Sequence, residues 1–218
     1  MRIDIAENAK GKLSAVFIAF TGLHNTENSD GLWADIDRLS SQLRAKYPSP
    51  ADALILFKNA RQLYKSIGID PTKLRPSSEA LTRRILQGKP LYRVNTLVDA
   101  GNYCSIHYQL PIGFYDLDAI EGEIVLRLGR TGEGYHGIHK GWINVEGRFT
   151  LADERGPFGN PSSDSDRSKV TLATTNALFC IFAFAGISVS ELSTHAEFTK
   201  QCITKCAQGN AAYDEIIR

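Results

Sequence analysis

The chain carries almost no net charge and few cysteines. Its 218 residues include 25 lysines and arginines against 24 aspartates and glutamates, which leaves a formal net charge of +1. A protein that binds polyanions through its overall charge would be far more basic, so any contact with nucleic acid must depend on a local patch. The four cysteines, Cys104, Cys180, Cys202 and Cys206, contain no Cys-x-x-Cys pair. This pattern excludes a disulfide framework and predicts reduced thiols in a cytoplasmic protein.

The chain also lacks a long apolar run. The longest one, residues 177–187, is too short to span a bilayer. The first twenty residues contain both acidic and basic side chains, which is not the composition of a signal peptide. We therefore expect no membrane partner.

Motifs for cofactors are incomplete. Gly132, Gly134 and Gly137 formally fit the pattern Gly-x-Gly-x-x-Gly, but the segment has the composition of a hairpin loop. No helix is predicted after it, so no helix N-terminus is available for a dinucleotide pyrophosphate. His136 and His139, like Cys202 and Cys206, have spacings found in metal sites, but neither pair has further ligands nearby in sequence. We expect no metal and no cofactor.

The spacing of apolar residues predicts helices and strands in mixed order. Helices are predicted over residues 31–47, 51–67, 76–88 and 190–208, and a further helix begins near Asn95. Strands are predicted over residues 2–5, 13–20, 123–128, 142–145, 149–152 and 178–185, and a polar loop over 160–168. No repeat or linker divides the chain. We therefore predict a single α+β domain, residues 1–218, with a mixed, mainly antiparallel β core flanked by about five helices.

Residues 93–116 carry a polar cluster. On a helix, Asn95, Asp99 and Asn102 fall within one narrow sector, and apolar side chains lie opposite. Each of these groups would cost about 1–3 kcal/mol if it were buried without a partner. The polar face therefore either forms a satisfied internal network or lines a ligand site.

Positive charge is concentrated in one segment, residues 73–93. It contains six cations and one acid, Glu79, and so carries a net charge of +5; the cations are Lys73, Arg75, Arg83, Arg84, Lys89 and Arg93. Cations at this density are typical of a phosphate-binding surface. The alternative is a solvated helix face whose arginines pair with acids. Arg75 and Glu79 are four residues apart, which is close enough to pair on a helix.

At the polar cluster a family resemblance is present. The pattern Asn95-x-x-Val98-Asp99-x-x-Asn102-Tyr103, followed by Pro111 and Asp116, resembles the editing domain of the bacterial phenylalanyl-tRNA synthetase β subunit, which consists of its third and fourth B modules. The run Arg-Pro-Ser-Ser-Glu-Ala-Leu at 75–81 is similar to one in small stand-alone proteins of this type. The resemblance covers residues 70–185. It implies a similar fold and hydrolysis of tyrosine wrongly attached to the phenylalanine tRNA.

Two positions differ from the pattern of that family. The family carries a histidine of the editing pocket between the proline and the aspartate, where this chain has Gly113. It also carries an acidic residue on a strand that corresponds to residues 177–183, which contain no carboxylate here. Nothing in the chain resembles the catalytic core that activates an amino acid with ATP, so the chain is not expected to be an aminoacylating ligase.

An activated aminoacyl ester can be hydrolysed by positioning a water molecule and stabilising an oxyanion. In this scheme Asp99 positions the water and His107 is the general base. The candidates for substrate binding are Asn95, Asn102, Asp116, Asp166, Ser78 and Glu79. Further acids, Asp153, Glu154 and Asp164, either hold an α-ammonium group or are solvated loop residues. The candidates for RNA binding are Arg75, Arg83, Arg84, Lys89 and Arg93.

Two hypotheses follow. In the first, the chain is an RNA-associated module that binds tRNA or aminoacyl-tRNA and hydrolyses a mischarged one in trans, as an aminoacyl-tRNA deacylase. In the second, it is a non-catalytic binding protein for a free amino acid or a related small metabolite. Binding that weakens steeply with salt would favour the first, because only phosphate contacts release counterions.

Overall fold

The computed structural model describes all 218 residues, 1–218. Its central element is a four-stranded antiparallel sheet of strand order β11-β2-β10-β3. The strands are β2 (Leu13–Thr21), β3 (Ile112–Asp116), β10 (Ala177–Phe184) and β11 (Asn210–Ile217). Strand β10 lies between β2 and β3, which agrees with the buried central strand predicted over residues 178–185.

A second sheet has the order β1-β4-β7-β8-β9, and only the β1–β4 pair is parallel. Its strands are β1 (Ile3–Ile5), β4 (Ile124–Leu128), β7 (Phe149–Asp153), β8 (Gly156–Asn160) and β9 (Ser163–Asp164). Strands β5 (Gly134–His136) and β6 (Trp142–Asn144) form a separate hairpin. The glycine-rich segment is therefore a hairpin and not a dinucleotide loop.

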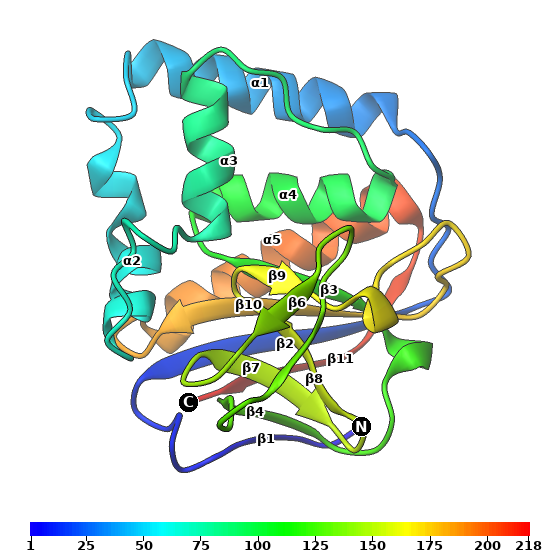
Figure 1. Ribbon diagram of the computed structural model, residues 1–218. Helices are drawn as coiled ribbons and strands as arrows, with labels where there is room; N and C mark the ends of the chain where they lie inside the picture. The colour runs from blue at the N-terminus through cyan, green and yellow to red at the C-terminus, as the bar shows by residue number, and fades with distance from the viewer.

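Five α-helices cover the sheets, namely α1 (Asp30–Lys46), α2 (Lys58–Lys65), α3 (Ser77–Leu86), α4 (Thr96–Tyr108) and α5 (Val189–Ala207). Short 3₁₀ helices are η1 (Leu54–Phe57), η2 (Leu117–Ala119) and η3 (Asp166–Ser168). Figure 1 shows α1, α3 and α4 above the strands, with the second sheet and both chain ends at the bottom. No helix combines the length and the hydropathy that crossing a membrane requires.

The four-stranded sheet is buried on both faces, which explains the continuous apolar sequences of β2 and β10. Ile18 and Phe179 face the core shared with α1, α4 and α5, whereas Phe17 and Phe182 face the core between the two sheets. Both cores therefore depend on the same two strands. Pairing with β10 places β3 at the edge of this sheet, where it contacts β9 of the second sheet.

The predicted fold class is confirmed: the protein is α+β, with five helices and mainly antiparallel sheets. The helix predicted over 51–67 is instead divided into η1 and α2. The loop predicted over 160–168 contains β9 and η3, and strands β3, β5, β8 and β11 were not predicted. These segments are short or lie at an edge, where local sequence gives a weak signal.

Candidate functional site

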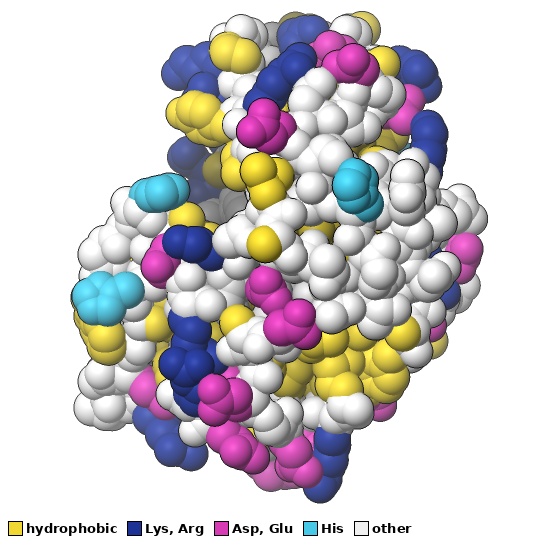
Figure 2. All heavy atoms as spheres, turned by 90° about the vertical axis from the view of Figure 1, so that its right-hand side faces the viewer, with side chains coloured by type: hydrophobic (Ala, Val, Ile, Leu, Met, Phe, Trp, Pro, Cys, Tyr) yellow, Lys and Arg dark blue, Asp and Glu magenta, His cyan; other side chains and the backbone are white.

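A cleft of about 540 Å³ opens between helices α3 and α4 and strands β3, β8 and β9. Pockets of 300–1,000 Å³ are typical of small-molecule sites. Its apolar walls include Leu81 of α3, Val98 of α4, and Ile112 and Phe114 of β3. On the face shown in Figure 2, the surface is hollowed between the helical upper part and the strand-rich lower part. The cleft therefore offers a wall for an apolar side chain, and more than half of its lining residues are polar.

Asp164 is the carboxylate of the cleft. It ends β9 and lines the cavity, and its Oδ1 atom is buried without a hydrogen-bond partner. Burial raises the pKa of this carboxyl from 3.8 to about 7, and the nearby Tyr115 hydroxyl and, less strongly, the ammonium of Lys140 oppose the shift. An acid with a pKa near neutrality exchanges protons readily at physiological pH, which suits a general base.

The loop that presents Asp164 is held by Asn160, which is itself buried and lines the cleft. Its Oδ1 accepts hydrogen bonds from the backbone N–H groups of Ser162 (2.7 Å) and Ser163 (3.0 Å). Its Nδ2 donates to the hydroxyl of Tyr135 at 2.7 Å, and that hydroxyl donates to the Ser163 carbonyl at 2.6 Å. These hydrogen bonds fix the backbone of residues 160–163, directly before Asp164.

Gly113 is a glycine because Tyr115 fills the adjacent space. A Cβ atom added at Gly113 would lie 2.0 Å from the Tyr115 hydroxyl oxygen, and one added at Gly159 would lie 2.3 Å from it. The ring is fully buried between these two glycines, and its hydroxyl has no hydrogen-bond partner. Burial and the nearby Asp164 raise the pKa of Tyr115 well above its usual value. A histidine at position 113 would require this tyrosine to move.

Of the polar cluster predicted on α4, only Asn102 lines the cleft, and its side chain makes no hydrogen bond within the protein. Asn95 is the N-cap of the helix, where its Oδ1 accepts from the Val98 N–H at 3.0 Å. Asp99 is 1% exposed and accepts from Trp33 Nε1 (2.9 Å) and from the Val94 N–H (3.1 Å). Asn95 and Asp99 thus belong to a satisfied internal network.

This network leads to a stability prediction for Asp99. Both carboxylate oxygens accept a hydrogen bond, so Asp99→Asn turns an NH₂ group toward one of the two donors. We expect the free energy of unfolding to fall by about 1–3 kcal/mol, the cost of an unsatisfied buried group. Urea unfolding of the variant measures it. An unchanged midpoint would show that Asp99 does not support the fold.

His107 lies away from the cleft. Its ring is exposed and stacks on Phe198 of α5, with ring centroids 3.8 Å apart and planes within 5°. Burial of part of the ring lowers the pKa of His107. Another histidine, His139, lies at the rim of the cleft and is exposed.

Ser78 and Glu79 lie on the buried face of α3 and do not line the cleft. Glu79 accepts from Arg61 Nε and Nη2 and from Arg83 Nε, each at 2.7 Å, and Arg75 lies 3.7 Å away. Burial opposes its ionisation, but the hydrogen bonds from Arg61 and Arg83 hold the pKa of Glu79 below its usual value. Ser78 donates to the Gln109 carbonyl at 3.4 Å. Both residues therefore fix α3 to its neighbours.

The two other predicted acids do not line the cleft either. Asp116 accepts from the hydroxyl of Thr174 at 2.6 Å and from the Asp118 N–H at 3.0 Å. Asp166 is exposed and pairs with Lys169 at 2.9 Å, a lysine that does line the cleft.

The predicted RNA-binding cations divide into two groups. Arg83 and Arg75 surround Glu79, whereas Arg84, Lys89 and Arg93 form no ion pair with a carboxylate. The positive charge that remains free on this surface therefore follows the end of α3 and the segment after it.

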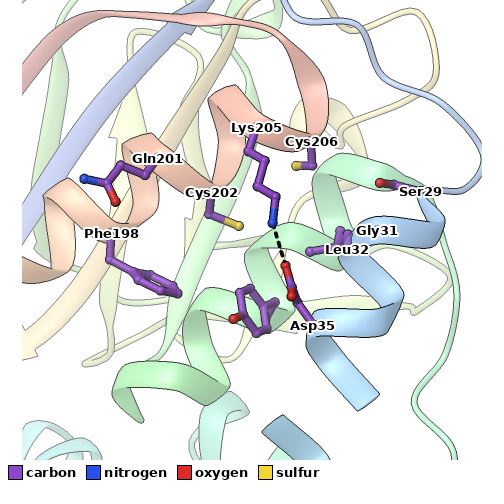
Figure 3. Close-up of a pocket in the computed structure, with 10 residues that line it drawn as sticks. Ser29, Gly31, Leu32, Asp35, Phe198, Gln201, Cys202, Lys205 and Cys206 are labelled. Carbon is purple, nitrogen blue, oxygen red and sulfur yellow. Dashed lines mark hydrogen bonds and ion pairs between the residues drawn. The ribbon is translucent and has the colours of Figure 1, made fainter. Parts of the chain in front are cut away.

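A smaller pocket of about 240 Å³ lies between α1, α4 and α5 (Figure 3). Asp35 and Lys205 form an ion pair of 2.9 Å across it, and Phe198, Cys202 and Cys206 line one side. Hydrogen bonds among neighbouring thiols, together with burial, raise the pKa of Cys202 and Cys206, so neither is a ready thiolate. No group of three or more His, Cys, Asp or Glu side chains is placed to hold a metal ion.

Sequence reasoning therefore did not single out Tyr115 and Asn160, and it gave Asp164 no priority over other acids. The available signal was the pair Gly159-Asn160 before a serine-rich, acidic run. A buried glycine beside a large aromatic ring is visible only once β3 and β8 are placed together.

Two packed sheets under a helical layer, with a cleft at the edge of one sheet, define an α+β protein. The family model described as the B3/4 domain matches residues 59–210. The chain belongs to the B3/4 domain family, and the resemblance seen in the sequence is confirmed.

A curated relative is the phenylalanine–tRNA ligase beta subunit of Streptococcus mutans serotype c (strain ATCC 700610 / UA159). It is 23% identical over 163 residues, which are 71% of this chain and 20% of the relative. The chain thus spans about one fifth of that relative's length. A solved structure, an N-terminal fragment of the phenylalanyl-tRNA synthetase β subunit from Pyrococcus horikoshii, is similar in fold with a TM-score of 0.53 and 13% identity, covering 100% of this chain and 54% of that one.

Proposed function

We propose that this protein is an RNA-associated module that binds aminoacyl-tRNA and hydrolyses a mischarged aminoacyl ester in trans, in the 540 Å³ cleft. The observation that carries the proposal is the unpartnered carboxylate of Asp164 in a cleft that also holds the free amide of Asn102. Membership of the B3/4 family and similarity to a synthetase β subunit support an ester of tRNA as the substrate.

The cleft can perform the reaction without a nucleophilic side chain. The Asp164 carboxylate takes a proton from a water molecule, whose oxygen attacks the carbonyl carbon of the ester. The bond from that carbon to the ribose oxygen breaks, and the proton passes to the ribose oxygen. Asn102 donates its amide N–H to the carbonyl oxygen as negative charge develops there, and the apolar wall of Val98, Ile112 and Phe114 holds the amino-acid side chain.

In this scheme Asn95 and Asp99, which were predicted to line the site, support it without touching the substrate. Asp99 and Asn95 hold the start of α4, and so position Asn102 two turns later. His107, on the α5 side of the helix, has no part in the chemistry. The substrate-binding role predicted for Asn102 is retained.

Replacement of Asn102 tests the proposal. We expect Asn102→Ala to lower the rate constant of hydrolysis by about 10²–10³, the usual effect of removing one oxyanion donor. The assay follows release of the amino acid from a panel of correctly and wrongly charged tRNAs, tyrosine on the phenylalanine tRNA included. Asn8→Ala is the matched control, because Asn8 does not line the cleft and its amide accepts a hydrogen bond from the Leu128 N–H at the end of β4. Equal rates in Asn102→Ala and the wild type would contradict the assignment of the oxyanion donor.

A further inference from the structure

The segment between α3 and α4, residues 87–95, carries an exposed aromatic ring among free cations. Tyr92 is 68% exposed and Val94 is 55% exposed, which is unusual for apolar side chains so close to a cleft. The guanidinium of Arg84 lies 4.1 Å from the centre of the Tyr92 ring. Arg84 also donates from Nε to the carbonyl of Pro90, which ties the segment to the end of α3.

The neighbouring cation is also held in place. Arg93 lies 4.3 Å from the centre of the Trp33 ring and donates from Nη1 to Asn28 Oδ1 at 3.1 Å. Lys89 is exposed, and no carboxylate pairs with Arg84, Lys89 or Arg93. Three cations without acids, two of them immobilised against aromatic rings, form a rigid surface for anions. Because these two side chains are already ordered, binding an anion costs them less conformational entropy than it would cost mobile side chains.

This surface leads into the cleft. Val94 and Val98 both line the cavity, and Val94 lies two residues after Tyr92. The backbone of Val94 is held by the carboxylate of Asp99 at 3.1 Å, and Thr96 by the Thr26 carbonyl at 2.8 Å. The path from the exposed ring of Tyr92 to the wall of the cleft is therefore short and fixed. In Figure 2, lysine and arginine side chains surround the helical upper part of the molecule, above the hollow.

We propose that Tyr92 is a stacking platform for the unpaired base of the nucleotide that precedes the 3′-terminal nucleotide of an RNA, whose terminal ribose enters the cleft. Arg84 holds one side of the ring, and the exposed ring surface receives the base. Arg84, Lys89 and Arg93 contact the phosphates that precede it. A single-stranded nucleic acid presents planar bases and phosphates in alternation, which matches an aromatic ring placed between cations. RNA is the occupant because the substrate of the proposed function is an aminoacyl ester of tRNA. The inference rests on the proposed function, since that function gives the RNA its reason to end in the cleft.

The energetic expectation follows from stacking and counterion release. Base stacking on an aromatic side chain contributes about 1–3 kcal/mol, so Tyr92→Ala should weaken RNA binding about 5- to 150-fold. Tyr92→Phe keeps the ring and should bind nearly as the wild type does. With three phosphate contacts on a single strand, log K should fall with log salt at a slope of about −2.

The experiment measures binding of a fluorescent single-stranded RNA that ends in CCA, by anisotropy, with no ester present. Trp142→Ala is the matched control, because Trp142 is 58% exposed and packs against a histidine instead of an arginine. The result expected is weaker binding in Tyr92→Ala only. Equal binding by Tyr92→Ala and the wild type, or tighter binding of an acidic peptide than of the RNA, would overturn the inference.

Hydrolysis distinguishes this inference from the proposed function. Tyr92→Ala should lower kcat/KM for aminoacyl-tRNA about as much as it weakens RNA binding, and should leave hydrolysis of aminoacyl-adenosine, which lacks the preceding nucleotides, unchanged. If the wild type binds the RNA through Tyr92 but hydrolyses neither ester, the proposed function fails and the platform stands. If it hydrolyses both and Tyr92→Ala hydrolyses both equally well, the platform fails and the function stands.

Discussion

Asp164→Asn should lower kcat/KM for hydrolysis of the mischarged tRNA by about 10²–10⁴, the usual contribution of a general base. The amide has nearly the same shape as the carboxyl group but cannot take a proton from water. The cleft, its apolar wall and Asn102 are retained, so binding of the substrate should change far less than the rate. Steady-state kinetics on the tRNA that the wild type hydrolyses best provides the measurement.

Asp166→Asn is the matched control for Asp164→Asn. The two aspartates lie two residues apart, but Asp166 is exposed, pairs with Lys169 and does not line the cleft. It should retain nearly all activity. If both variants lose activity equally, the effect comes from the charge of the loop and not from proton transfer by Asp164.

The raised pKa of Asp164 also predicts two pH dependences. In the wild type, kcat/KM should rise with pH and level off above about 7, where the carboxyl is ionised. Because the pKa is higher in the folded protein than the ordinary 3.8, the free energy of unfolding should fall as pH rises from about 4 to about 7. Asp164→Asn should remove this decline. A rate profile that is flat between pH 5 and 8 would contradict the role of the carboxylate.

The largest effect on stability is expected at Glu79. Glu79→Gln leaves Arg61 and Arg83 without their carboxylate, and the buried amide would face three N–H donors from these arginines. Breaking a buried ion pair costs about 3–5 kcal/mol, and we expect the lower end because both arginines are partly exposed. Chemical unfolding at pH 7 gives the value. A loss below about 1 kcal/mol would show that the cluster contributes no more than a surface pair.

The pH dependence of this effect has a definite sign. The pKa of Glu79 is lowered on folding, so its stabilisation is fully present above about 4.5 and is lost as pH falls through the folded value. The difference between the wild type and Glu79→Gln should therefore shrink in acid. Glu197→Gln, which removes an exposed pair with Lys200, should change stability by only about 0.5 kcal/mol at any of these pH values.

Much of the fold could be predicted because its strongest elements have strong local patterns. Strand β10 is a continuous apolar run, and α1 has a clear helical repeat that ends near a Tyr-Pro-Ser-Pro sequence. Strand β11 could not be predicted, because five of its eight residues are exposed and its apolar pattern is weak. The break between η1 and α2 depends on how Phe57 packs under α3, which no local sequence pattern records.

The site was harder to predict, because helical periodicity places Asn95, Asp99 and Asn102 on one side but does not say what covers that side. Trp33, far away in sequence, reaches Asp99 and closes most of the face. Only Asn102 remains open to the cleft. The charge of the basic segment was visible in the sequence, but the contact of Arg61 with Glu79 and the exposure of Tyr92 required the packing of α3.

A crystal structure with a non-hydrolysable analogue tests directly whether an aminoacyl group binds in the 540 Å³ cleft. The analogue is a 3′-aminoacyl-adenosine in which an amide replaces the ester. We expect its aminoacyl group between α4 and β9, with the carbonyl oxygen at Asn102 and the attacked carbon facing Asp164. Binding in the pocket of Asp35 and Lys205 instead, or no binding at millimolar concentration, would contradict the assignment of the cleft.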